Sequence, residues 1–160
     1  MAVSHEYEVS VEWTGNRGEG TRDYKSYDRN FLIHGTGKPD IAGSSDAAFR
    51  GDPARWNPED LLLASVSACH KLWYLHLCAD AGIQVTSYQD HAIGRMITDA
   101  KGGAFKKIIL RPVITIVNKE DIGKSQALHH DAHQKCFLAN SVNFPIEIDA
   151  RISAETADSH

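Results

Sequence analysis

The sequence lacks a basic excess, a long apolar run and an even set of cysteines. Its net charge of -4 offers no basic surface to a nucleic acid. No apolar run approaches the about 20 residues that span a bilayer, and no basic stretch followed by an apolar one marks a secretory signal. Three cysteines (Cys69, Cys78 and Cys136) are an odd number for a secreted disulfide framework. We therefore expect a cytoplasmic protein without nucleic-acid or membrane partners, in which any disulfide is transient.

The residues that are present fit one globular domain. The chain has 160 residues, 42% of them apolar and 24% charged, which is ordinary for a globular protein. This length is enough for one domain with a hydrophobic core and too short for two domains of ordinary size. The prediction is a single domain over residues 1–160.

Alternating apolar residues, turn residues and helical periodicity divide the chain into strands and two helices. Strands are expected at residues 6–13, 21–27, 30–34, 83–97, 105–117 and 144–152, and helices at 58–81 and 119–138. The order βββαββαβ predicts an α+β fold with a mostly antiparallel sheet. Residues 35–58 form a loop that is long enough to suspect a function.

The first helix carries clear start and stop signals. Asn57 is an N-cap residue, Pro58 suits the first helical position, Glu59 and Asp60 favour the positive end of the helix dipole, and Gly82 is a natural stop. Apolar side chains point in nearly every direction from this helix. We therefore expect a long, buried central helix, and one sheet of short strands does not cover it. A homodimer with an extensive interface is the consequence.

Cys69 lies in the middle of this helix, among apolar neighbours. It lies 11 residues beyond Pro58, roughly 17 Å along the axis, and the helix dipole acts only near the first turn. Burial disfavours a thiolate, so an activating cation must come from another segment. Arg50 and Arg55 in the preceding loop and Arg17 in the first turn are the candidates. Without such a cation, Cys69 is an inert packing residue.

The segment Asn57-Pro58-Glu59-Asp60-Leu61, with Ala68-Cys69 ten residues after Glu59, resembles the Asn-Pro-Glu-x-Leu…Ala-Cys signature of the OsmC/Ohr family of thiol-dependent organic hydroperoxide reductases. Cys136 lies on the second long helix, where the family has its second redox cysteine. The expected order of strands and helices also agrees. The chain looks closest to the broad OsmC-like branch of this family.

The resemblance implies an antioxidant peroxidase: an intertwined homodimer that reduces organic hydroperoxides at its subunit interface. Cys69 would be the peroxidatic cysteine, Cys136 the resolving cysteine that closes a Cys69–Cys136 disulfide, and Glu59 the carboxylate that holds an activating arginine. A small dithiol or a dihydrolipoyl-type protein would be the reductant, with no metal or cofactor. Cys78 faces another side of the helix and is expected to be structural.

Three positions depart from the family pattern. The family's arginine precedes a Phe-x-Gly or lies in the first glycine-bearing turn, whereas Ala48 precedes Phe49 here. Arg50 is therefore the first choice for the activating residue, followed by Arg55 and Arg17. His70 replaces the usual aromatic residue after the first cysteine, and Phe137 replaces the usual proline after the second. The residues expected to bind substrate are Trp56, Arg55, His70 and Trp73.

Two other functions stay open at this point. His129 and His133 are spaced i, i+4, and Cys136 follows three residues later, so this helix could bind zinc or copper. A polar helix face is the commoner explanation of such histidines. The second alternative is a non-enzymatic dimeric protein of the same fold, a stress protein that binds a small apolar ligand while Cys69 only packs.

Overall fold

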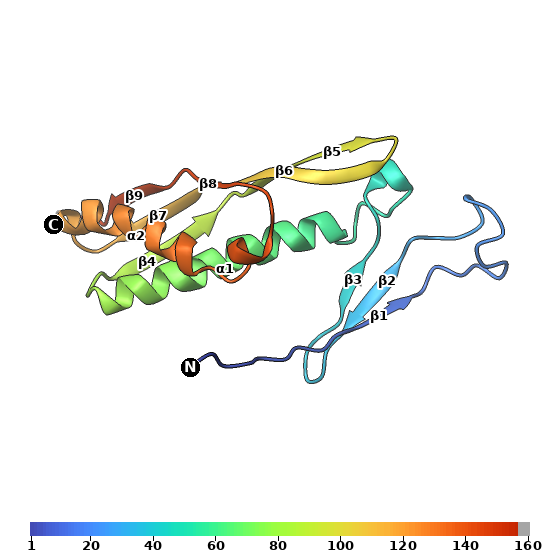
Figure 1. Cartoon of the computed structure of the whole chain (residues 1–160), viewed down its shortest axis with the longest axis horizontal. Coiled ribbons are helices and arrows are strands. Elements are labelled where there is room, and N and C mark those ends of the chain that lie inside the picture. The colour runs from blue at the N-terminus through green and yellow to red at the C-terminus, as the bar shows by residue number, and fades with distance from the viewer. Residues whose placement is uncertain (157–160) are drawn as a thin grey trace. The chain divides into compact units, whose positions relative to one another are not determined.

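The computed structural model describes residues 1–156 (Figure 1). These residues separate into two compact units, an N-terminal unit up to Leu61 and a C-terminal unit from Leu62 onward. The single domain over residues 1–160 stays a prediction. No helix in the described part of the chain is both long and apolar enough to cross a membrane.

The N-terminal unit is built on a small antiparallel sheet. Its strands β1 (Ser10–Trp13), β2 (Phe31–His34) and β3 (Ile41–Gly43) pair in that order, and a short 3-10 helix, η1 (Ala47–Phe49), follows. The third strand lies inside the segment expected to be a loop. It pairs with β2 on one side, and on the other side this stretch of chain exchanges two backbone hydrogen bonds with Trp56: Trp56 N donates to Ala42 O (3.2 Å), and Ser44 N donates to Trp56 O (2.9 Å).

The strand expected at residues 21–27 is wrong. These residues form turns, because local hydrogen bonds satisfy their backbone in place of a sheet partner. The Asp23 carboxylate accepts a hydrogen bond from Lys25 N at 2.8 Å, and the Ser26 hydroxyl accepts one from Asp23 N at 3.0 Å. The Ser26 hydroxyl donates to the carbonyl of Asp23 at 2.9 Å. The turn residues therefore decide the conformation of this segment.

The C-terminal unit contains two long helices and two three-stranded sheets. Its elements are α1 (Pro58–Asp80), which starts in the preceding unit, β4 (Val85–Asp90), β5 (Ile93–Asp99), β6 (Gly102–Leu110), β7 (Pro112–Ile116), η2 (Lys119–Asp121), α2 (Ile122–Lys135), η3 (Ala139–Ser141), β8 (Ile146–Ile148) and β9 (Arg151–Ala154). The sheets have the orders β4-β7-β9 and β5-β6-β8. Strands β4 and β5 pair antiparallel with β7 and β6, whereas β8 and β9 run parallel to β6 and β7.

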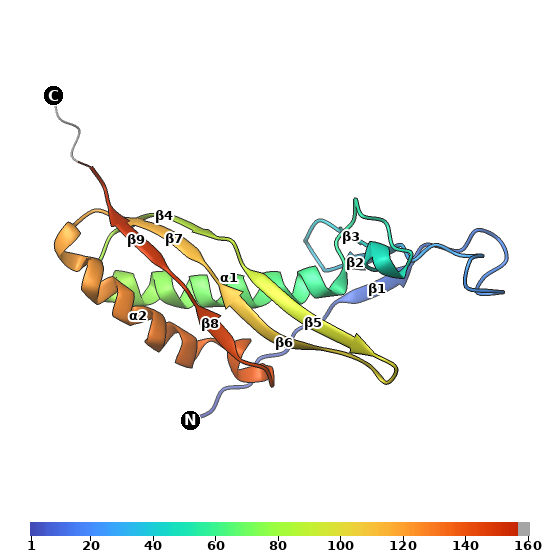
Figure 2. The same ribbon diagram turned by 90° about the horizontal axis from the view of Figure 1, so that it is seen from above.

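Each of the three strands expected in this unit is divided into two shorter strands. The division between β6 and β7 falls at Arg111, directly before Pro112, which has no N–H to continue the ladder. Pro112 predicts an edge strand or a bulge, but β7 is the central strand and the proline occupies its first residue. Both helices cover one face of the sheets, and the other face is open (Figures 1 and 2).

Helix α1 begins and ends where the sequence predicts. The Asn57 side chain accepts a hydrogen bond from Asp60 N at 2.8 Å, and the Asp60 carboxylate accepts one from Asn57 N at 3.5 Å, a reciprocal capping box. At the other end Gly82 has φ 74°, and Ile83 N donates to Cys78 O at 2.8 Å in a Schellman arrangement. Both boundaries are therefore determined locally.

The core of the C-terminal unit lies between the helices and the sheets. Helix α1 contributes a buried stripe at i, i+4 spacing, consisting of Val66, His70, Tyr74 and Cys78. Within this single chain the opposite side of α1 is open, and Leu72 is 64% exposed. Such an exposed apolar side is what the expected dimer would cover, and the homodimer stays a prediction.

Candidate active site

The structure brings Cys69 and Cys136 together. Cys69 lies in the middle of α1 and is half-buried, whereas Cys136 is 1% exposed. The expected helix over residues 119–138 ends earlier, at Lys135, so Cys136 is its C-cap residue and its backbone N–H donates to Ala132 O at 2.9 Å. This helix end lies against α1, and the two thiols are close enough for Cys69 to influence the pKa of Cys136. Solvent therefore reaches the pair from the Cys69 side.

Burial raises the pKa of Cys136 to about 11. The neighbouring Cys69 thiol raises this pKa further, while the backbone N–H of Ala139, 3.5 Å from the sulfur, opposes the shift. Cys136 is therefore protonated at neutral pH. Since it is also almost inaccessible, it is poorly suited to react first with a molecule from solution.

Cys78 belongs to the core. It is 1% exposed on the buried stripe of α1, and burial raises the pKa of its thiol. It packs in a cluster with Tyr74 and Ile114. The placement agrees with the expectation that Cys78 is structural.

An aromatic pair lies beside the two thiols. Trp73 follows Cys69 by one helical turn, and Phe137 follows Cys136 directly. The two rings meet edge to face, with centroids 5.5 Å apart and planes at 85°. Phe137 is 63% exposed, so the pair presents an apolar surface to solvent next to the sulfurs. The role of Trp73 in substrate binding stays a prediction.

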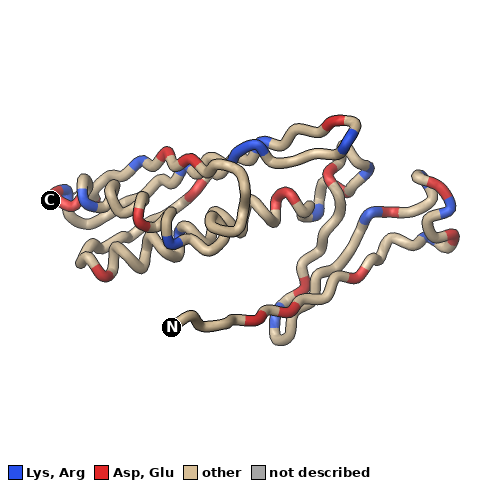
Figure 3. The backbone as a smooth tube through the Cα atoms, in the orientation of Figure 1, with Lys and Arg blue, Asp and Glu red and all other residues tan. Residues whose placement is uncertain are grey.

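Helix α1 itself supplies almost no charge near Cys69. Lys71 is the one charged side chain between Asp60 and Asp80 (Figure 3). It lies two residues beyond Cys69, which is about 200° around the helix axis, so it points away from the sulfur. An activating cation must therefore belong to another segment.

The three candidate arginines all belong to the N-terminal unit, where each has partners of its own. Arg17 pairs with the Asp28 carboxylate at 3.8 Å, and Arg55 pairs with that of Asp52 at 3.8 Å and donates to Phe31 O at 3.4 Å. Glu59 is half-buried in the first turn of α1, and the Trp56 side chain is 57% exposed in the same unit. Their catalytic and substrate-binding roles stay predictions.

Arg50 differs from the other two because its backbone is strained. With φ 64° it is the one non-glycine residue in the left-handed region among the described residues. The next residue, Gly51, comes so close to the chain that an added Cβ would lie 1.5 Å from Ser45 O. The guanidinium lies 5.9 Å from the centroid of the Tyr24 ring. A tightly built loop therefore holds Arg50 in a costly conformation, as is common at functional sites.

A pair of buried histidines is the feature that the sequence analysis missed. His70 Nε2 and His129 Nδ1 are 2.9 Å apart, so one ring donates a hydrogen bond to the other, and Tyr74 stacks on His129 with a centroid distance of 4.0 Å. Burial lowers the pKa of His70 to about 4 and that of His129 to about 3. The second ring nitrogen of each has no partner among the described residues. The i, i+4 stripe on α1 was a signal for this buried position.

The histidine pair bears on two expectations. His70 is 1% exposed, so its imidazole lies in the core, and its role in substrate binding stays a prediction. The metal alternative combines His129, His133 and Cys136, yet within residues 1–156 no three histidine, cysteine or acidic side chains are grouped as metal ligands would be. His129 instead faces His70 on the other helix.

Fold and site together define an α+β protein with a pair of neighbouring thiols, one half-buried and one buried. The chain belongs to the OsmC-like protein family, whose pattern it matches over residues 51–151. The family assignment and the predicted α+β fold are therefore confirmed.

Three similar proteins illustrate the relationship. An OsmC-like protein of unknown function from Vibrio cholerae is 28% identical, with a TM-score of 0.83 over 92% of this chain and 100% of that one. An organic hydroperoxide resistance protein from Elizabethkingia anophelis is 21% identical, with a TM-score of 0.65 over 96% and 100% of the two chains. The uncharacterized protein YmaD of Bacillus subtilis is 21% identical over 96% of this chain and 97% of its own.

Proposed function

We propose that the protein is a cysteine-based peroxidase that reduces organic hydroperoxides to alcohols. The closeness of the Cys69 and Cys136 thiols is the observation that carries the proposal, because a sulfenic acid on one would have the other as its neighbour. Membership of the OsmC-like family supports it, as does the likeness in fold to an organic hydroperoxide resistance protein.

The difference in exposure between the thiols suggests their order of reaction. Cys69, the half-buried thiol, attacks the outer oxygen of the hydroperoxide as a thiolate. The O–O bond breaks, Cys69 becomes a sulfenic acid, and the alkoxide takes a proton and leaves as the alcohol. Cys136 then attacks the Cys69 sulfur, and water leaves as the disulfide forms. Two electrons from a small dithiol or a dihydrolipoyl-type protein restore both thiols.

Arg50 is our first candidate for the residue that stabilises the Cys69 thiolate and the departing alkoxide, followed by Arg55 and Arg17. The strained, closely packed loop around Arg50 supports this choice. Glu59 would hold the guanidinium through a two-pronged ion pair. In the proposed homodimer, the arginine and the thiols need not come from the same subunit.

The apolar surface beside the thiols suggests the substrate. The rings of Trp73 and Phe137 can pack against a bulky alkyl group. Hydrogen peroxide has no apolar group and gains nothing from this surface. We therefore expect bulky organic hydroperoxides to react faster than hydrogen peroxide. A non-enzymatic ligand-binding protein would use the same surface and leave Cys69 unreactive.

The deciding experiment is mass spectrometry of the intact protein after one equivalent of a bulky alkyl hydroperoxide. The expected result is the loss of two hydrogens, with Cys69 and Cys136 joined in one peptide pair. C136S should accumulate a sulfenic acid on Cys69, and C78S, the matched control, should behave like the unchanged protein. An unmodified Cys69 in the folded protein would end the proposal and favour the non-enzymatic alternative.

A further inference from the structure

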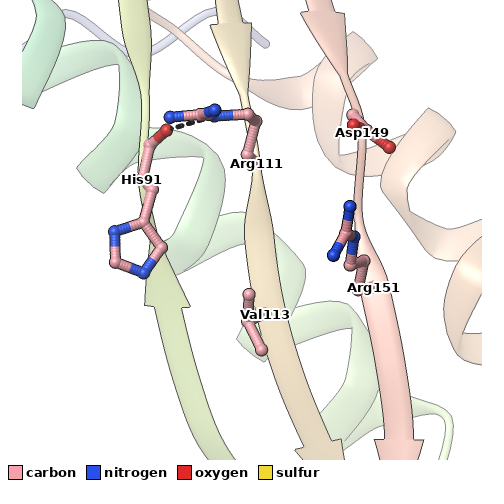
Figure 4. Close-up of a pocket in the computed structure, with 5 residues that line it drawn as sticks. All are labelled: His91, Arg111, Val113, Asp149 and Arg151. Carbon is pink, nitrogen blue, oxygen red and sulfur yellow. Dashed lines mark hydrogen bonds between the residues drawn. The ribbon is translucent and has the colours of Figure 1, made fainter.

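The open face of the sheet β4-β7-β9 carries a pocket far along the chain from both cysteines. Its volume is about 280 Å³, at the small end of the range for ligand pockets. His91, Arg111, Val113, Asp149 and Arg151 line it (Figure 4). Helices α1 and α2 lie behind the strands in this view, so the pocket opens away from them.

The sheet itself positions the two arginines. Arg111 occupies the junction between β6 and β7, where its backbone N–H donates to the Asp90 carboxylate and its Nε donates to His91 O, both at 2.7 Å. Arg151 begins β9 and is paired in register with Val113 on the central strand. Val113 therefore lies beside Arg151 on the neighbouring strand and two residues beyond Arg111 on its own.

Both guanidinium groups keep hydrogen-bond donors to spare. Within residues 1–156, neither Arg111 nor Arg151 has a carboxylate at ion-pairing distance. The terminal nitrogens of Arg111 and the whole guanidinium of Arg151 donate no hydrogen bond to a described residue. Of the other six arginines, Arg17, Arg22 and Arg55 each pair with an acidic residue, whereas Arg29, Arg50 and Arg95 have no such pair among the described residues.

The geometry points to a binding site for a phosphate group on this face, either free phosphate or the phosphate of a small monoester. Two arginines can each donate two parallel hydrogen bonds to such an anion, which is the strongest common arrangement for phosphate. The His91 imidazole adds one more donor. With a neutral histidine and one carboxylate, the pocket keeps one net positive charge.

Asp149 gives the site its selectivity. The Arg151 guanidinium extends along its strand toward Asp149 (Figure 4), whose carboxylate would repel a bare anion while accepting a hydrogen bond from a hydroxyl group. A phosphate monoester that carries a hydroxyl near its phosphate suits this arrangement better than inorganic phosphate. Inorganic phosphate and a phosphate monoester both present a dianionic phosphate group to the arginines. They differ in the alcohol part, which only the monoester carries.

The test is a titration followed by backbone amide NMR at constant ionic strength, with inorganic phosphate, methyl phosphate and glycerol 3-phosphate as separate probes. We expect saturable shifts at residues 90–92, 111–113 and 149–151, with dissociation constants of about 1 mM or below. R111Q and R151Q should each weaken binding about tenfold. R95Q is the matched control, since it removes the same charge from an exposed position on β5 outside the pocket.

The variant D149N distinguishes a site for inorganic phosphate from a site for a phosphate monoester. It should tighten inorganic phosphate by removing a repulsion and should abolish any preference for glycerol 3-phosphate over methyl phosphate. Equal binding of all three probes to the unchanged protein would mean that the site takes the free anion. Shifts that do not saturate, or equal losses in R95Q, R111Q and R151Q, would overturn the proposal. R151Q removes no contact within the described chain, so its result does not depend on folding, and no probe reacts with the thiols.

Discussion

The two units of this chain are held together by different forces. In the described chain every buried apolar side chain of the core belongs to the C-terminal unit, and the N-terminal unit has none. Its strand β1 has all four residues exposed, and Val9 and Val11 are each 64% exposed. Backbone pairing and side-chain hydrogen bonds maintain this unit, whereas hydrophobic burial maintains the other.

The reactive thiols and the candidate activating arginines belong to different units. Both thiols lie in the unit with its own core, and the candidate arginines lie in the unit without one. The folding of one unit therefore positions the thiols, whereas in the proposed mechanism their activation would come from an arginine of the other unit. Changes in the two units should consequently have different effects, on activity in one case and on stability in the other.

The largest expected effect comes from the arginines. Changing Arg50 to Gln should lower peroxide reduction about 100-fold, because a donor to the developing charge is lost. The chemical unfolding midpoint should change little, since Arg50 is exposed and part of no core. The measurement is steady-state turnover with the alkylation rate of Cys69 as a function of pH. R55Q and R17Q receive the same assay.

R22Q is the matched control for these variants, because Arg22 is an exposed arginine of the same unit whose partner is Glu19. If all three candidate arginines can be replaced while Cys69 stays as reactive as before, activation does not come from the N-terminal unit.

The second effect concerns stability. Ile114 is 0% exposed in the core, so I114A should lower the free energy of unfolding by about 3 kcal/mol through lost burial and a cavity. V11A on the exposed strand β1 should change it by less than about 0.5 kcal/mol. Urea unfolding at several protein concentrations measures both. A large, concentration-dependent loss in V11A would instead show that β1 is buried in an oligomer.

The third effect is a pH dependence that belongs to the C-terminal unit. His70 and His129 are neutral in the fold because burial lowers the pKa of His70 to about 4 and that of His129 to about 3. Below the ordinary pKa of about 6.5 the unfolded chain takes up these protons first, so stability should fall with falling pH. The loss should be on the order of 2 kcal/mol for each histidine between pH 7 and pH 5.

Replacing both histidines, as in H70L combined with H129F, should flatten this dependence, while H76Q on the exposed side of α1 should leave it intact. A slope that persists in the double variant would assign the effect to other groups.

The smallest effect has the opposite sign and belongs to the N-terminal unit. Hydrogen bonds to Asp40, at 2.8 Å, and to Glu12, at 3.0 Å, raise the pKa of His34. Its contribution to stability is present below about pH 6.5 and is lost as pH rises through the raised pKa. NMR titration of the imidazole should show a His34 pKa above the ordinary histidine value of about 6.5. D40N should lower that pKa, and an unchanged value would mean that Asp40 is not the partner in solution.

The elements that could be predicted are those specified by neighbouring residues. Helix α1 was predicted within one residue, because Asn57, Pro58 and Gly82 act within one turn of its ends. The division of the long strands was not predicted, because apolar alternation continues past His91 and Arg111 and does not show where a strand bends. The strand expected at residues 21–27 failed because side chains of the segment, Asp23 and Ser26, satisfied its backbone locally.

The candidate site was predictable in part for the same reason. Motif spacing pointed to Cys69 and Cys136, but spacing carries no information on whether two helices meet at those residues. His129 was considered with His133 because they share a helix, whereas its observed partner, His70, lies 59 residues away on another. Such a pairing depends on helix packing, which periodicity alone does not predict.

The sequence by itself determined the family, the α+β class, the ends of α1 and the two cysteines worth testing, because each of these follows from residue identity over a few turns of chain. Tertiary structure alone decided that the two thiols are neighbours, that two buried histidines hydrogen-bond to each other, and that Arg111 and Arg151 line one pocket. These outcomes depend on distances between segments that lie far apart along the chain, and packing of the whole core sets those distances.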